Sequence, residues 1–200
     1  MSKMSPHIRQ VIRMALLNMR IEEIEHAYYA AVGSLTNQKI TESEKIRGIL
    51  KLGPEEPLPE PEADDEGGFI DEIYELAAER IERANNSIPF VRKAFVIGLF
   101  HLWERHCNSA MKRNRYIHDD VMVWMEANGR RLKAETLLHL ELACHCAKHG
   151  PGNSCKKLWK LRPDLFNRVN NEGQASESTL VISNETFDEF LKAVSTSRRG

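Results

Sequence analysis

The chain has 200 residues, of which 42% are hydrophobic and 28% charged, and its formal net charge at pH 7 is −1. This length suits one domain, or one domain with appendages, that buries about 70% of the surface of its unfolded chain. The basic residues are scattered, which excludes a broad basic surface for nucleic acid but leaves a local phosphate site open. No apolar run is long enough to cross a membrane.

The four cysteines are Cys107, Cys144, Cys146 and Cys155. Their spacing is not that of a small secreted disulfide framework, and no signal peptide precedes them. We therefore expect reduced thiols and a cytoplasmic protein.

Residues 1–52 are predicted to form an N-terminal helical segment. Spacings of three and four residues predict an amphipathic helix from Met4 to about Ala31, and Ser5-Pro6 supplies a start signal for it. Its apolar positions are Ile8, Val11, Ile12, Ala15, Leu16, Met19, Ile24 and Ala27. A separate short helix is expected over 42–50. Residues 53–68 hold four prolines, seven acidic side chains and no basic one, which is typical of a solvated linker.

Residues 69–170 are predicted to be the helical core. A helix over 69–83 is followed by a pause at Asn85 to Pro89, and then by the most apolar helix, over 90–111, which we place at the centre of the bundle. Further helices are expected over 118–126, 133–149 and 154–161. His101, Glu104 and Arg105 lie near the end of the central helix, and because unpaired buried charge is costly we expect them to form a network with the His-rich helix over 133–149.

Residues 171–200 form a tail of a different kind. Thr179 to Ile182 has the β-branched content of a short strand, which either pairs with another chain or stays an extended connection. A last helix follows, capped by Ser183 or Asn184. Since strands and helices do not alternate along the chain, the sequence predicts an all-α helical bundle with this short extended segment and a C-terminal helix.

Glu141, His145 and His149 are four residues apart and share one face of their predicted helix. Two imidazoles and a carboxylate could bind a divalent metal, although zinc would need further ligands that the sequence does not fix. Alternatively, Glu141 pairs with His145, and His149 interacts with the negative end of the helix. We favour this second interpretation and predict no metal and no other cofactor.

The second candidate site is Arg113-Asn114-Arg115-Tyr116-Ile117-His118. A histidine can move protons during RNA cleavage while an arginine stabilises the charge that grows on phosphorus. Chance alone should give about two Arg–His pairs with four to six intervening residues in this composition. Two occur, and the other is Arg20 with His26. The spacing by itself therefore favours a solvated loop between helices over a functional site.

The segment Leu99-Phe100-His101-Leu102-Trp103-Glu104-Arg105, the helix end Ala147-Lys148-His149-Gly150 and the later Arg162-Pro163-Asp164-Leu165-Phe166 resemble an uncharacterised bacterial family whose helical bundle is similar to that of HEPN domains. The resemblance covers residues 69–194. It implies a homodimeric, metal-independent ribonuclease of bacterial defence or a toxin–antitoxin system, with RNA as substrate, an antitoxin or other protein as partner and no membrane association. The family signature implies catalytic roles for Arg113, Asn114 and His118.

The same resemblance offers an alternative placement. His149-Gly150 resembles the end of the signature, but Cys144 and His145 occupy the positions of its arginine and following polar residue. Lys148, or Arg105 from elsewhere, would then have to supply the missing charge. In that case the resemblance implies a catalytically inactive module that binds a protein or nucleic acid, and the sequence leaves both interpretations open.

Overall fold

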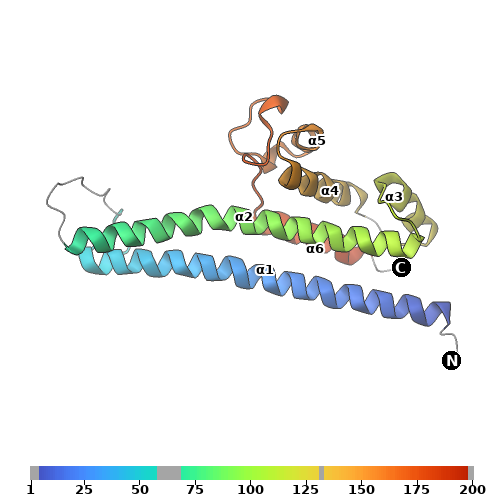
Figure 1. Cartoon of the computed structure of the whole chain (residues 1–200), viewed down its shortest axis with the longest axis horizontal. Coiled ribbons are helices and arrows are strands. Elements are labelled where there is room, and N and C mark those ends of the chain that lie inside the picture. Colours follow the sequence, from blue (N-terminus) through green and yellow to red (C-terminus); the bar gives the residue numbers. More distant parts are fainter. Residues whose placement is uncertain (1–4, 58–68, 131–132, 198–200) are drawn as a thin grey trace. The chain divides into compact units, whose positions relative to one another are not determined.

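A computed structural model describes residues 5–57, 69–130 and 133–197, without the side chains of 6, 7, 9, 10 and 69–73. All of its regular elements are helical (Figure 1), which confirms the all-α prediction. The six α-helices and two 3₁₀ turns are α1 Pro6–Leu50, α2 Phe69–Met111, α3 His118–Ala127, α4 Ala134–His149, α5 Asn153–Leu161, η1 Pro163–Leu165, η2 Glu172–Gln174 and α6 Asn184–Thr196. They form two compact units, residues 29–91 and residues 1–28 with 92–200.

Within the unit 29–91, α1 continues without the predicted interruption before residue 42. Thr36 donates its hydroxyl to the carbonyl of Val32 inside the helix. Glu42 is buried and accepts hydrogen bonds from Lys45 at 2.8 Å and Arg80 at 3.4 Å. The prediction of a separate short helix over 42–50 is therefore wrong. Helix-breaking signals are weak compared with the packing of an apolar face, which is the main source of helix stability.

The predicted pause at Asn85 to Pro89 is also wrong, because α2 passes through it with Pro89 inside the helix. Proline removes one backbone donor and clashes with the preceding turn, at a cost of about 3 kcal/mol. Buried side chains lie before and after it, at Ala77 and Ala84 and then at Val96 and Leu99. Burial of both halves offsets the local cost, so a single helix replaces the two that were predicted. The predicted linker lies mostly outside the described residues.

The core of the unit 1–28 with 92–200 is built around the C-terminal half of α2, as predicted. Val96, Leu99, Phe100 and Trp103 of α2 are at most 1% exposed. Buried residues of α4 and α6 complete the core, among them Leu137, Leu140, Ala143, Phe187, Phe190 and Val194. Tyr28 of α1 stacks on Phe187 with ring centroids 3.8 Å apart, and its hydroxyl donates to Asn184.

The first turns of α1 bury a different side of the helix from the one that was predicted. The predicted core positions Ile8, Val11, Ile12, Leu16 and Met19 are all exposed. Leu17, Ile21 and Tyr28, on the opposite side of the helix, are buried. Periodicity identified the helix correctly, but it cannot tell which of two apolar faces the rest of the chain covers.

The extended segment near Thr179 forms one isolated antiparallel bridge between Leu180 and Phe166. Val181 N donates to Leu165 O at 2.8 Å, and Asn167 N donates to Thr179 O at 2.9 Å. The segment is therefore an extended connection paired inside its own chain. Ser183 then caps α6, since its hydroxyl accepts a hydrogen bond from Thr186 N at 3.1 Å, as predicted.

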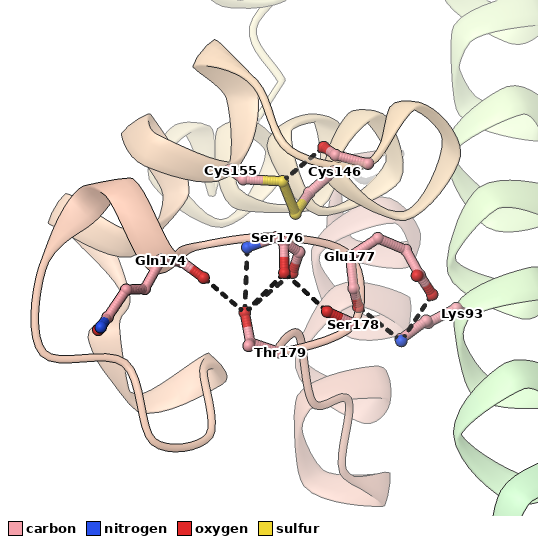
Figure 2. The surroundings of a disulfide bond; sticks show 9 residues. Lys93, Cys146, Cys155, Gln174, Ser176, Glu177, Ser178 and Thr179 are labelled. Carbon is pink, nitrogen blue, oxygen red and sulfur yellow. Dashed lines mark hydrogen bonds and ion pairs between the residues drawn. A yellow bond between two sulfur atoms is a disulfide. The ribbon is translucent and has the colours of Figure 1, made fainter.

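A disulfide joins Cys146 in the last turn of α4 to Cys155 in the first turn of α5 (Figure 2). The expectation that every cysteine is reduced is therefore wrong, although Cys107 and Cys144 are free and buried. The turn between the helices brings the two Cα atoms within 4.9 Å, and Gly150 in it adopts a φ of 69°, which favours glycine. Among the described residues, no helix has both the length and the apolar content needed to span a bilayer.

Candidate functional site

His118 is the first residue of α3, and its imidazole faces α4. Its Nδ1 atom lies 3.5 Å from Oε2 of Glu141 and 3.4 Å from the hydroxyl of Tyr116. Tyr116 is itself buried and accepts a hydrogen bond from the indole of Trp103. A rigid aromatic support therefore holds the ring of His118 beside a carboxyl group.

Glu141 of α4 stands between two imidazoles. Its Oε1 atom lies 3.8 Å from Nε2 of His145, while Oε2 faces His118. Burial, helped by the nearby carboxylates of Glu104 and Asp119, raises the pKa of Glu141 to about 7. Burial also lowers the pKa values of His118 and His145 below their ordinary range.

These distances alone would suggest ion pairs, but the pKa shifts oppose that description. Each shift favours the uncharged form of its group, because the cost of removing the charge from water exceeds the electrostatic attraction gained at these short distances. Near neutral pH the site therefore holds neutral imidazoles beside a carboxyl group that is about half protonated. A neutral base beside a protonated acid is what proton transfer at neutral pH requires.

An open pocket of about 440 Å³ adjoins this pair, a volume suited to a small ligand. It is lined by residues of α3, α4 and α5, namely His118, Asp119, Leu138, Glu141, Leu142, Lys157, Lys160 and Leu161. Lys160 is paired with Glu172 at 2.5 Å. No ion pair engages Lys157 among the described residues, so its ammonium group can meet an anionic ligand.

Arg113 follows the end of α2, where Lys112 adopts a φ of 56°. Its exposed guanidinium group forms an ion pair with Asp120, in the same first turn of α3 that holds His118. No hydrogen bond or ion pair joins Arg113 to His118 in the described part of the chain. Asn114 is exposed in the bend between the helices. The motif therefore places its arginine and its histidine at one helix end, each with a different carboxylate.

The residues of the alternative site meet α2. Lys148 Nζ donates to Nε2 of His101 at 3.2 Å, and Nδ1 of His101 lies 2.8 Å from Glu104. Since an ammonium group only donates, Nε2 of His101 is the acceptor in this contact, and Nδ1 faces the carboxylate of Glu104. The predicted network between these helices is confirmed.

The other members of the alternative site are arranged less tightly. The rings of His145 and His149 stack with centroids 6.0 Å apart. Arg105 donates to the carbonyl of His101 within its own helix. Within residues 5–57, 69–130 and 133–197, no three His, Cys, Asp or Glu side chains are grouped as metal ligands.

Sequence reasoning found His118 and Glu141 but did not connect them. Glu141 was considered only with residues of its own helix, because helical spacing predicts neighbours within one element and not across elements. Lys157 carried no signal at all, since a lysine on a short amphipathic helix is ordinary. Its place in the pocket depends on the sharp turn after His149.

Comparisons with protein families, with curated proteins and with solved structures found no match to this chain.

Proposed function

We propose that this protein is a HEPN-like ribonuclease that cleaves RNA at the pocket between α3, α4 and α5. One observation carries the proposal: His118 and Glu141 line a single open pocket together with the ammonium group of Lys157. A neutral base, a carboxylic acid and a cation are the groups needed to break a phosphodiester bond by proton transfer.

In the proposed reaction, His118 accepts the proton of a ribose 2′-hydroxyl group. The 2′-oxygen then bonds to the adjacent phosphorus atom, and the bond from phosphorus to the 5′-oxygen breaks. The protonated carboxyl group of Glu141 gives its proton to the departing 5′-oxygen. The products are a 2′,3′-cyclic phosphate and a free 5′-hydroxyl group, and no external oxidant or water is consumed.

In this proposal, two cationic side chains bind the phosphate of the substrate. Lys157 acts from the wall of the pocket, and Arg113 acts from the loop after α2, once it has exchanged Asp120 for the substrate. Electrostatic stabilisation of the transition state by such groups is commonly worth a few kcal/mol. Asn114, next to Arg113, is the third residue that the sequence motif assigns to this role.

The biological setting follows from the family resemblance. We propose a homodimer in a bacterial defence or toxin–antitoxin system, restrained by an antitoxin or another protein partner. The Cys146–Cys155 disulfide removes the thiol argument for a cytoplasmic location, which now depends on the family resemblance alone. No cofactor and no membrane enter the proposal.

The test is the cleavage of a fluorescently labelled single-stranded RNA by the purified full-length protein in the presence of a chelator. We expect products that end in a cyclic phosphate, and we expect equal rates with and without the chelator. The same RNA with a 2′-deoxyribose at the cleavage position should remain intact. Cleavage of that substituted RNA at the parent rate would contradict the proposed reaction.

A second candidate function is a catalytically inactive module that binds a protein or nucleic acid. The observation that favours it is the engagement of the motif arginine with Asp120 and of Lys148 with His101. Under this alternative the protein binds RNA or a partner without cleaving it. Cleavage that is lost in Arg113→Ala would rule it out.

A further inference from the structure

The first six or so turns of α1 are apolar on two opposite sides. One side carries Leu17, Ile21 and Tyr28, which are at most 4% exposed. The other side forms a continuous line in helical spacing, which we name the α1 stripe: Ile8, Val11, Ile12, Ala15, Leu16 and Met19. Its five larger side chains are 42–54% exposed. A helix that packs on one core needs only one apolar side, so the stripe calls for a further partner.

The size of the stripe supports the same conclusion. Six half-exposed apolar side chains present on the order of 400 to 500 Å² in one continuous patch, which is as large as the functional patches of monomeric proteins. Scattered apolar residues on a surface need no explanation, but residues aligned over about three helical turns do.

We infer that the α1 stripe binds the same stripe of a second copy of this chain, with the two helices antiparallel. A two-fold axis at the middle of the stripe sets Ile8 opposite Met19. In the same register, Val11 lies opposite Leu16 and Ile12 opposite Ala15. Every member of the stripe then meets an apolar partner, as an isologous interface requires.

Charge at the end of the stripe selects the antiparallel arrangement. Glu22 and Glu23 continue the line of the stripe and are exposed. In the antiparallel register they reach the beginning of the partner's α1, where the backbone N–H groups carry partial positive charge and the first turn holds no acidic residue. A parallel pair would bring the four carboxylates together. The same two carboxylates oppose docking on an anionic lipid surface.

Two such stripes bury about 1,000 Å² in total, at the lower end of specific interfaces. The dimer should therefore dissociate at concentrations of about 1 to 100 μM. This inference concerns a surface and not the pocket, and it stands whether or not the protein cleaves RNA.

The test is analytical ultracentrifugation of the full-length protein from about 1 to 300 μM. We expect a monomer–dimer equilibrium, which Leu16→Lys weakens at least tenfold. Leu76→Lys is the matched control, because Leu76 is 53% exposed and Leu16 is 49% exposed. Circular dichroism verifies that both variants remain folded. A parent that stays monomeric throughout, or equal weakening by both variants, would overturn the inference.

Cysteine crosslinking tests the direction of the helices. A mixture of Ile8→Cys and Met19→Cys chains should form a disulfide-linked dimer under mild oxidation, well above the level of either variant alone. Preferential crosslinking of Ile8→Cys with itself would show a parallel pair and overturn the antiparallel assignment. The parent protein supplies the background, since its two free cysteines are buried.

Discussion

Nδ1 of His118 lies 3.5 Å from Oε2 of Glu141, and both side chains line the same open pocket. Burial disfavours the charged form of each group, which raises the pKa of Glu141 and lowers that of His118. The pair therefore resembles an acid and a base prepared for exchange of protons with a ligand more than it resembles a structural ion pair.

Glu141→Gln tests the state of that carboxyl group through stability. Because the folded pKa of about 7 lies above the ordinary 4.5, Glu141 stabilises the fold below about pH 4.5, and this contribution is lost as the pH rises through 7. Between pH 4.5 and 8, the free energy of unfolding of the glutamine variant should therefore rise by at most about 3 kcal/mol relative to that of the parent. Urea unfolding at both pH values measures this difference. A difference between the two proteins that does not change with pH would contradict the raised pKa.

Lys157→Gln tests the cation of the pocket. Loss of one phosphate contact should raise KM for single-stranded RNA about fivefold and make the salt dependence of binding shallower by about 0.7 in the logarithmic slope. Lys192→Gln is the matched control, because Lys192 is exposed on α6 and does not line the pocket. Equal effects of the two substitutions would show that only overall charge matters.

Asp120→Asn tests whether Arg113 serves the substrate. The substitution removes the carboxylate that now pairs with Arg113, so binding of RNA should become about two- to fivefold tighter. Combining it with Arg113→Ala should abolish that gain. Filter binding at fixed ionic strength measures both effects. Tighter binding that persists without Arg113 would remove this arginine from the site.

Reduction of the Cys146–Cys155 disulfide tests the connection between α4 and α5. The bond closes a loop with a sequence separation of nine residues, and opening such a loop should lower the free energy of unfolding by about 2 to 3 kcal/mol. Chemical denaturation with and without a dithiol measures the loss. A Cys146→Ser, Cys155→Ser double variant should show no response to the dithiol, and a parent that is equally insensitive would contradict the bond.

The sequence predicted those features of the fold that depend on local patterns. Helical spacing located α3 to α6 within a few residues, and Ser183 caps α6 as expected. The two interruptions in α1 and α2 were wrong because the packing of long helices outweighs a proline or a polar run. The disulfide was missed because proximity of Cys146 to Cys155 depends on a reversal of the chain that cysteine spacing does not reveal.

The candidate site was predicted in its parts and not in its assembly. His118 and Glu141 each stood out for their chemistry, but 23 positions separate them in the sequence. Only the tertiary fold, which sets the first turn of α3 beside Glu141 of α4, brings them together. The α1 stripe is the opposite case. Its helical periodicity could be predicted from the sequence, but the exposure of that face to solvent could not. Amphipathic spacing reveals that a face needs a partner, and tertiary structure decides whether the chain itself provides one.

The most direct measurement is the rate of RNA cleavage by His118→Ala beside its matched control, Arg20→Ala with His26→Ala. Arg20 and His26 reproduce the motif spacing on exposed positions of α1, away from the pocket. The account predicts that His118→Ala loses a factor of about 100 to 10,000 in kcat while the control retains the parent rate. Cleavage by His118→Ala at the parent rate would contradict the account.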